Sequence, residues 1–349
     1  MTNIQTIKTT LKSAVTLLNN KEATLEAQLL LQQVLNVNRA WLITHESDVL
    51  TANQQATFEA LFQRRLTGEP LAYILGRGGF YGLDLMVTPD TLIPRPDTET
   101  LVEAALVKIP AQNISTNSPR PLWERGGGEG HICQEATIEV NIPSISPLSP
   151  EGRGDFDGRR DSSSLNDLSL NMIVKDNFEV LDLGTGTGAI ALAIAHHRPQ
   201  ANITAVDFSK AALKIAQKNA KNLRLSNVTF KHSDWFSALK GQKFDVIVSN
   251  PPYIESNDPH LAALAFEPIS ALTSGADGLD DIRKIAQSAL IYLKPQGWLM
   301  LEHGYNQAEK VQDLLAENGL TDITTIKDLG GNDRVTIGKN PLIINTHWD

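Results

Sequence analysis

Hydrophobic side chains recur at helical spacing through the first 67 residues of the chain. One apolar face carries Ile7, Leu11, Val15 and Leu18, a second carries Leu25, Leu29, Leu30 and Val34, and a third carries Phe58, Leu61 and Phe62. Asn20-Lys21 and Asn36-Val37-Asn38 interrupt the pattern, and residues of this kind commonly end helices. The spacing predicts a small α-helical bundle domain over residues 1–70.

Two short apolar segments follow the expected bundle and predict a bridge to the rest of the chain. Residues 71–75 and 80–87 are joined through Gly76-Arg77-Gly78-Gly79, and two apolar runs around a glycine-rich turn are typical of a β-hairpin. Pro94-Arg95-Pro96 then restricts the backbone before a helix expected from about residue 97 to 108. We expect a β-hairpin and a linker helix over residues 71–109.

The hydrophobic pattern is lost between residues 110 and 175. Proline, glycine and serine dominate there, as in Ser118-Pro119-Arg120-Pro121 and Gly126-Gly127-Gly128. Such sequence buries too little apolar surface to offset the entropy of ordering it. We therefore expect a low-complexity, disordered insertion, and its interleaved acidic residues argue against RNA contact through its arginines.

Strands and helices are expected to alternate from residue 176 to 340. The β-branched, apolar segments lie at 179–183, 202–207, 227–231, 244–249, 297–302, 321–327 and 333–338. Helical patterns lie between them at 188–197, 209–224, 280–293 and 305–318. This order predicts an α/β domain with a doubly wound, mostly parallel sheet.

Composition and charge narrow the classes of function. A length of 349 residues suggests two domains, no apolar run approaches a membrane span, and no cleavable signal is visible. The single cysteine, Cys133, excludes an internal disulfide and fits a reducing cytoplasm. The histidines show no metal-ligand spacing, so no metal is expected. The net charge of −9 argues against a nucleic-acid substrate. A lysine stripe at helical spacing is interpreted as a solvated face, with docking of an acidic or RNA-bound partner as the alternative: Lys210, Lys214, Lys218 and Lys221.

A glycine-rich turn after the strand at 179–183 is the first candidate binding element. Gly184, Gly186 and Gly188 can adopt positive φ and allow close approach of a ligand to the backbone and to a helix N-terminus. Asp207 ends the next strand, roughly 20 residues later, where an acidic side chain can bind ribose hydroxyls. The same spacing also satisfies a dinucleotide fingerprint, so a nicotinamide-dependent oxidoreductase stays open.

The segment Asn250-Pro251-Pro252-Tyr253 is the second candidate, directly after the strand at 244–249. Two prolines make the backbone rigid and extended at the carboxyl end of a strand, where open α/β sheets bind ligands. The Asn250 oxygen and the Pro251 carbonyl can each accept one N–H of a planar amino group, while the Tyr253 ring covers its flat face. Combined with the glycine-rich turn, this favours methyl transfer from S-adenosyl-L-methionine to an amine or amide.

Several motifs together resemble the HemK/PrmC family, the protein-(glutamine-N5) methyltransferases of class I peptide-chain release factors. The motifs are Glu69-Pro70-Leu71-Ala72-Tyr73-Ile74-Leu75-Gly76, Phe80-Tyr81-Gly82-Leu83, Leu92-Ile93-Pro94-Arg95-Pro96-Asp97-Thr98-Glu99, Ser233-Asp234-Trp235-Phe236, Phe266-Glu267-Pro268, Ser274-Gly275-Ala276-Asp277-Gly278-Leu279 and Glu302-His303-Gly304-Tyr305. They span the chain except residues 110–175, where the family has only a short connector. The resemblance implies a Rossmann-like, seven-stranded class I methyltransferase domain, preceded by a helical bundle that recognises the protein substrate and by a β-hairpin linker.

The resemblance also implies the activity and the role of each site residue. The expected reaction, part of translation termination, carries a methyl group from S-adenosyl-L-methionine to the glutamine of the release factor's Gly-Gly-Gln motif. Asn250, Pro251 and Tyr253 are the expected catalytic residues, and with Pro252 they bind the substrate. The expected cofactor residues are Gly184, Thr185, Gly186, Thr187, Gly188, Asp207, Trp235 and Asn250, with Asp234 near the adenine amino group.

Three other functions share parts of these motifs. An N6-adenine DNA methyltransferase, or another amine methyltransferase, would use the same Asn-Pro-Pro-Tyr segment, but a DNA enzyme should bring a basic recognition region. A nicotinamide-dependent oxidoreductase would leave that segment unexplained. A noncatalytic adaptor would have no need of both intact binding elements. Release factors are therefore the expected partners.

Overall fold

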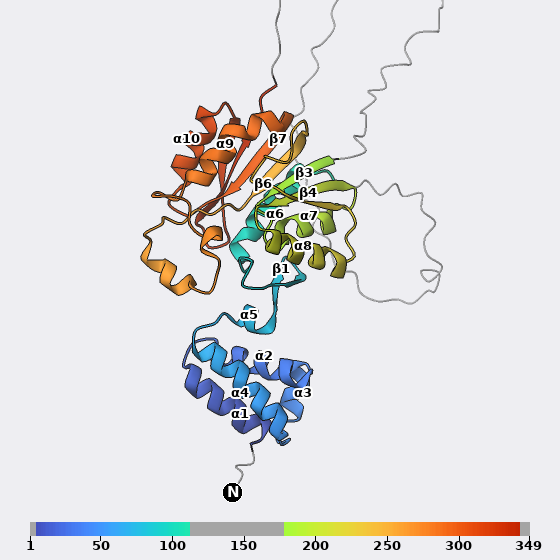
Figure 1. Ribbon diagram of the computed structural model, residues 1–349, viewed down its shortest axis with the longest axis vertical. Coiled ribbons are helices and arrows are strands. Elements are labelled where there is room, and N and C mark those ends of the chain that lie inside the picture. The colour runs from blue at the N-terminus through green and yellow to red at the C-terminus, as the bar shows by residue number, and fades with distance from the viewer. Residues whose placement is uncertain (1–4, 112–177, 343–349) are drawn as a thin grey trace, which may run out of the picture. The chain divides into compact units, whose positions relative to one another are not determined.

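The computed structural model describes residues 5–111 and 178–342 of the chain (Figure 1). The expected insertion at 110–175 lies outside these residues except for Pro110 and Ala111, so its disorder stays a prediction. Among the described helices, none has both the length and the apolar character needed to cross a membrane.

The N-terminal part is an α-helical bundle. Its helices are α1 (Ile7–Leu18), α2 (Ala23–Leu35), α3 (Arg39–Thr44) and α4 (Ala52–Leu66). Thr6 and Thr51 begin α1 and α4 with capping boxes, and Asn19 and Asn36 end α1 and α2 in the left-handed conformation, so local sequence sets the helix limits. Leu25 differs from the expected apolar face because it is 48% exposed.

The bridging segment corrects one prediction. Residues 71–75 form helix α5 (Leu71–Leu75), and not the first strand of the hairpin. Leu71, Ile74 and Leu75 pack on the core of the bundle, a contact that helical spacing permits. Gly76 then ends α5 at φ 69°.

The hairpin itself begins later than expected and is built from β1 (Arg77–Phe80) and β2 (Leu83–Met86). The glycine-rich stretch predicted as the turn belongs mostly to β1. Its turn is Tyr81-Gly82, where both residues have positive φ, the requirement of a two-residue hairpin turn. The Asn219 carboxamide, on helix α8 (Lys210–Asn222), then bonds to β2: it accepts from Met86 N at 2.7 Å and donates to Met86 O at 3.0 Å.

The C-terminal part is organised around one sheet of seven strands in the order β5-β4-β3-β6-β7-β9-β8. The strands are β3 (Phe178–Leu183), β4 (Ala201–Asp207), β5 (Val228–His232), β6 (Phe244–Ser249), β7 (Leu293–Glu302), β8 (Thr321–Lys327) and β9 (Asp333–Lys339). Strands β3 to β7 pair in parallel, and β9 is antiparallel to both of its neighbours. The predicted seven-stranded, mostly parallel sheet is confirmed.

Helices cover both faces of the sheet (Figure 1). They are α6 (Glu99–Lys108), α7 (Ala189–His197), α8 (Lys210–Asn222), α9 (Asp280–Tyr292) and α10 (Ala308–Glu317). Val180 and Val246 contact the layer that contains α6 and α7, whereas Leu181 and Ile247 contact the layer that contains α9 and α10. This alternation follows from the two-residue period of a strand. Helix α6, expected as a linker, is therefore part of the sheet's cover.

Candidate active site

A cavity of about 470 Å³ opens at the carboxyl ends of β3, β4, β5 and β6. Strand β3 lies between β4 and β6, so the chain reverses its direction of winding here, which is where doubly wound sheets bind ligands. This larger cavity is lined in part by residues that end a strand or follow it: Gly184, Gly186, Asp207, Phe208, Ser209, Ser233, Asp234, Trp235, Asn250 and Pro252. The structure therefore brings most of the expected cofactor residues together.

The glycine-rich turn contributes only part of its length to the larger cavity. Gly184 (φ 72°) and Gly186 (φ 55°) line it, and a Cβ at Gly186 would meet no atom within 4 Å. Gly188 instead begins α7, where a Cβ would lie 3.0 Å from Leu192. Thr185 and Thr187 are buried, and neither lines the cavity.

The buried carboxyl group of Asp182 supports the glycine-rich turn from inside the sheet. Its Oδ2 accepts the Thr185 hydroxyl at 2.6 Å and the Ala191 amide at 3.2 Å. Burial raises the pKa of Asp182 to about 7. The sequence interpretation missed this residue, although its position two residues before the first glycine was a usable signal.

The Asp207 carboxylate is held in place by backbone donors at the cavity wall. Gly186 N donates to its Oδ2 at 2.8 Å, and Ser209 N donates to its Oδ1 at 2.7 Å. Each oxygen keeps a lone pair for a ligand hydroxyl, while burial raises the pKa of Asp207 above its usual value. Phe208, which the sequence interpretation missed, lines the same wall and is 72% exposed.

Trp235 and Asp234 line another part of the wall, after β5. The Trp235 ring lies 3.6 Å from the position of a Cβ on Gly184, so the indole and the glycine-rich turn are in contact. Size, aromatic surface, backbone freedom at the glycines and hydroxyl-accepting carboxylates together fit S-adenosyl-L-methionine. Among the described residues, no cluster of His, Cys, Asp and Glu could hold a metal ion.

A smaller cavity of about 270 Å³ shares Leu92, Asn250 and Ala271 with the larger one. Pro251 and Tyr253 line only the smaller cavity, and Pro252 lines only the larger one. Asn250 therefore stands between the two spaces. The expected substrate-binding residues come together around this boundary.

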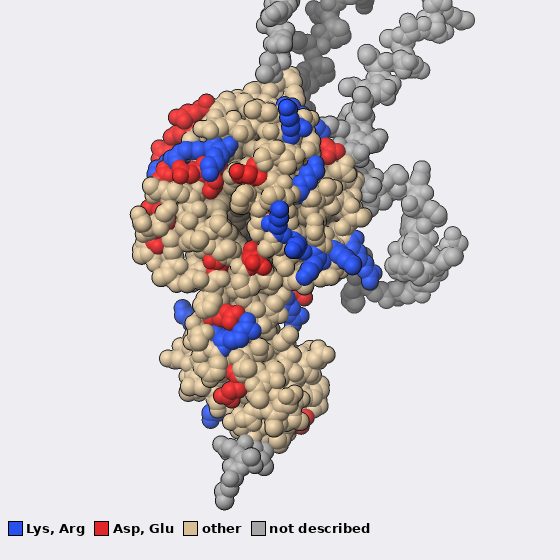
Figure 2. All heavy atoms as spheres, in the orientation of Figure 1, with Lys and Arg blue, Asp and Glu red and all other residues tan. Residues whose placement is uncertain are grey.

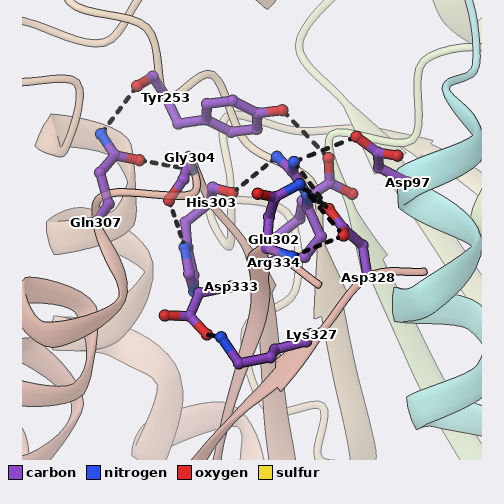
Figure 3. A network of polar contacts seen from close by, with 11 residues as sticks. Asp97, Tyr253, Glu302, His303, Gly304, Gln307, Lys327, Asp328, Asp333 and Arg334 are labelled. Atoms are coloured by element: carbon purple, nitrogen blue, oxygen red, sulfur yellow. Dashed lines mark hydrogen bonds and ion pairs between the residues drawn. The ribbon is translucent and has the colours of Figure 1, made fainter. Parts of the chain in front are cut away.

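Hydrogen bonds from outside the motif hold the segment 250–253 in place. The Asn250 Nδ2 donates to Thr98 Oγ1 at 3.1 Å, and the Tyr253 hydroxyl donates to Glu302 Oε1 at 3.3 Å. The Tyr253 carbonyl accepts from Gln307 Nε2 at 3.0 Å (Figure 3). Burial, with the Glu302 charge beside it, raises the pKa of Tyr253 well above its usual value.

Two segments distant in sequence form the remaining walls of the smaller cavity. Ile93 N and the Arg95 guanidinium both donate to the carboxylate of Glu267, whose side chain is 3% exposed. Glu267 lies between the 3₁₀ helices η3 (Pro259–Leu264) and η4 (Ile269–Ala271). The sequence interpretation gave Arg95, Thr98, Glu267 and Glu302 no site role, although all four lie in its quoted motifs.

On the face of the molecule shown in Figure 2, lysine and arginine side chains gather over α8. The predicted lysine stripe at 210, 214, 218 and 221 is exposed there, opposite the buried face of the helix. The exposure agrees with a solvated face, and docking of an acidic or RNA-bound partner on these lysines stays a prediction.

Comparison with known proteins identifies the family. Residues 174–336 match the model described as a methyltransferase domain, and residues 9–76 match the PrmC N-terminal domain. The release factor glutamine methyltransferase of Xylella fastidiosa (strain 9a5c) is 41% identical over 318 residues, covering 90% of this chain and 93% of that protein. Its counterpart from Pseudomonas aeruginosa is 40% identical over 336 residues, covering 96% and 98%.

A solved protein-(glutamine-N5) methyltransferase from Alicyclobacillus acidocaldarius is 25% identical, covers 74% of this chain and 100% of that chain, and superposes with a TM-score of 0.33. The family assignment is carried by the sequence relatives. The chain belongs to the release factor glutamine methyltransferases, which confirms the resemblance found in its motifs.

Proposed function

We propose that this member of the release factor glutamine methyltransferases carries the methyl group of S-adenosyl-L-methionine to the side-chain nitrogen (N5) of the glutamine in the Gly-Gly-Gln motif of class I release factors. The observation that carries the proposal is the pair of adjoining cavities with Asn250 at their boundary. One space suits the cofactor, and the other suits an extended side chain with a terminal amide.

The larger cavity provides the groups that would hold the cofactor. Gly184 and Gly186 leave room beside the backbone, Asp207 offers its carboxylate to the ribose hydroxyls, and Trp235 offers its ring to the adenine. When bound there, S-adenosyl-L-methionine supplies an electrophilic methyl group on its sulfonium.

The residues around the smaller cavity act on the acceptor nitrogen. An amide nitrogen is a weak nucleophile because its lone pair is delocalised into the carbonyl. Asn250 Oδ1 and the Pro251 carbonyl each accept one N–H of the glutamine, which aligns the nitrogen and stabilises the positive charge that develops on it. Tyr253 covers the flat face of the amide.

The proposal extends to the setting of the reaction. The partner is the release factor, the enzyme acts in the cytoplasm, and nucleic acid is not its substrate. The net charge of −9 supports the last point, because binding to phosphates needs a surplus of positive charge.

Methyl transfer from labelled S-adenosyl-L-methionine tests the proposal. The acceptors are an unmethylated class I release factor, the same factor with its motif glutamine replaced by alanine, and naked DNA. We expect label only in the intact factor. Label in DNA, or equal label in the alanine variant, would overturn the glutamine assignment.

A further inference from the structure

One buried carboxylate, Glu302, lies behind the two residues that shape the smaller cavity. Ser249 pairs with Leu301 across β6 and β7, so Asn250 and Glu302 follow at neighbouring strand ends. Glu302 is 1% exposed, and its Oε1 accepts the Tyr253 hydroxyl at 3.3 Å (Figure 3). The mechanism above uses Asn250 and Tyr253 but gives Glu302 no part.

Thr98 connects this carboxylate to Asn250. Its hydroxyl oxygen accepts from Asn250 Nδ2 at 3.1 Å, and the same hydroxyl offsets part of the rise that burial causes in the pKa of Glu302. Oε2 of Glu302 is buried, and no hydrogen bond to it is seen within the described residues. It is therefore the oxygen available to the proton of Thr98, which is 4% exposed.

The direction of these bonds matters because the two ends of an asparagine carboxamide are chemically opposite. One end accepts hydrogen bonds and the other donates them, and a half-turn of the side chain exchanges the two. A hydroxyl that donates its hydrogen bond to a carboxylate can only accept hydrogen bonds from its other neighbours. Thr98 then binds the Asn250 NH₂ and leaves Oδ1 free.

We propose that Glu302 and Thr98 are positioning residues for methyl transfer, because the Glu302 carboxylate accepts a hydrogen bond from the Thr98 hydroxyl, and Thr98 in turn orients Asn250 with its oxygen toward the acceptor. The inference rests on the proposed function, since it assigns Asn250 Oδ1 to the glutamine amide. The same carboxylate holds the hydroxyl of Tyr253, so a single group sets two walls of the smaller cavity.

The charges around Glu302 leave it available for this role. Burial and Asp97 favour the neutral form of this carboxyl group, and Arg334 favours its ionised form. The Arg334 guanidinium itself pairs with Asp328 at 3.1 Å and with Asp97 at 3.2 Å, so the Glu302 oxygens are left to the hydroxyls of Tyr253 and Thr98.

Two substitutions at Thr98 separate the hydroxyl from the shape of the side chain. Thr98→Val keeps the volume and removes the hydroxyl, whereas Thr98→Ser keeps the hydroxyl. At saturating cofactor we expect Thr98→Val to lower kcat on the release factor by roughly 10-fold, the equivalent of one net hydrogen bond, and Thr98→Ser to restore most of it. The Kd for S-adenosyl-L-methionine should stay unchanged in both.

Thr100→Val is the matched control. Thr100 lies two residues further along and is 9% exposed, and no hydrogen bond from its hydroxyl is seen within the described residues. This variant should keep wild-type kcat. A Thr98→Val enzyme with wild-type kcat, or a Thr98→Ser enzyme as slow as Thr98→Val, would overturn the inference.

A second readout does not depend on the identity of the acceptor. In ¹⁵N-labelled protein, the side-chain NH₂ signals of Asn250 should shift in Thr98→Val and remain near their wild-type position in Thr98→Ser and Thr100→Val. Unshifted signals in Thr98→Val would overturn the inference even if the release factor is methylated. A wild-type enzyme that fails to methylate the factor would overturn the proposed function, and the NMR comparison would still decide the role of Thr98.

Discussion

The two cavities are built in different ways, although Asn250 belongs to both. The larger cavity combines the ends of β3, β4 and β5 with residues 89–92 and 268–271, and backbone groups after β3 and β4 hold its Asp207 carboxylate. The smaller cavity draws on residues 92–95, 250–254 and 264–272. The segments that carry these residues are held by partners up to 174 residues apart, as in the bond from the Ile93 backbone N–H to Glu267.

Because the two cavities are built differently, substitutions around them should affect different steps of the reaction. The larger cavity depends on local turns at the ends of strands, so changes there should act first on cofactor affinity. The smaller cavity depends on distant hydrogen bonds, so changes in its supports should act on turnover or on the binding of the release factor. Each prediction below tests that division, beginning with the largest effect.

The greatest loss is expected at the boundary residue. Asn250→Ala removes one acceptor for the glutamine N–H and should lower kcat by about 10²–10³-fold, as loss of a preorganised catalytic hydrogen bond does. The Kd for S-adenosyl-L-methionine and the melting temperature should change little. Single-turnover methylation with saturating cofactor measures the effect, and full turnover in this variant would show that Asn250 does not grip the acceptor.

Asp207→Ala should act on the other side of the division. Loss of the carboxylate leaves the ribose hydroxyls without an acceptor. It also leaves the Gly186 N–H, which donates to the carboxylate at 2.8 Å, without its partner. Hydrogen bonds to a charged group contribute roughly 1.5–3 kcal/mol, so the Kd for S-adenosyl-L-methionine should rise by about 10- to 100-fold. Calorimetry gives the Kd, and kcat at saturating cofactor should be nearly retained. An unchanged Kd with a low kcat would contradict the assignment.

Glu267→Gln should affect the release factor and spare the cofactor. The variant keeps an acceptor for Ile93 N but loses the ion pair to Arg95, which ties residues 92–95 to the segment around η4. Because both segments line the smaller cavity, we expect the KM for the release factor to rise about 5- to 10-fold, the effect of one weakened charged contact.

The control for Glu267→Gln is Asp333→Asn. This substitution also removes an ion pair, between β8 and β9, but the pair is exposed and neither of its residues lines a cavity. It should leave both KM values unchanged. Equal effects of the two substitutions would mean that the Glu267 pair only stabilises the fold.

A pH profile distinguishes the two cavities through their buried carboxyls. Burial raises the pKa of Glu302 to about 7, against the opposing influence of Thr98, Arg334 and Tyr253. Glu302 is needed as the carboxylate, which exists above that pKa, so kcat at saturating cofactor should rise severalfold between about pH 6 and pH 8. Thr98→Val, which cannot pass the effect to Asn250, should give a flatter profile.

Asp182, whose pKa is also about 7, lies under the glycine-rich turn. Its titration should therefore appear in the Kd for the cofactor measured across the same range, and not in kcat at saturating cofactor. A kcat profile that is flat in the wild-type enzyme would contradict the role given to Glu302.

The smallest effect is expected from shortening the insertion. Helix α6 ends at Lys108 and β3 begins at Phe178, and a short Gly/Ser connector in place of residues 112–175 would join them. Loop closure changes by only about 0.6 kcal/mol per doubling of length. The melting temperature, the Kd for cofactor and kcat should stay close to wild type. A large drop in melting temperature, or selective loss of transfer to the release factor, would assign the segment a structural or docking role.

Most of the catalytic fold, and the strand-end residues of the larger cavity, could be predicted from the amino-acid sequence. All seven strands of the sheet were predicted within a few residues, because β-branched apolar runs ending in glycine, aspartate or proline are local signals. Gly184, Gly186, Asp207 and Trp235 line the larger cavity as expected, since parallel strands bring their carboxyl ends to one edge of the sheet.

Features that depend on contacts between residues far apart in sequence could be seen only in the tertiary structure. Residues 71–75 form a helix because Leu71, Ile74 and Leu75 pack on the bundle. A five-residue apolar run does not by itself distinguish a helix from a strand. Thr185 and Thr187 are buried and Gly188 packs against Leu192, so none of the three lines the larger cavity. The residues that support the smaller cavity belong to motifs quoted from the sequence, but no role could be predicted for them there: Thr98, Glu267 and Glu302. Their roles follow from hydrogen bonds between segments that only the folded sheet brings together, because sequence spacing carries no information about which distant side chains will meet.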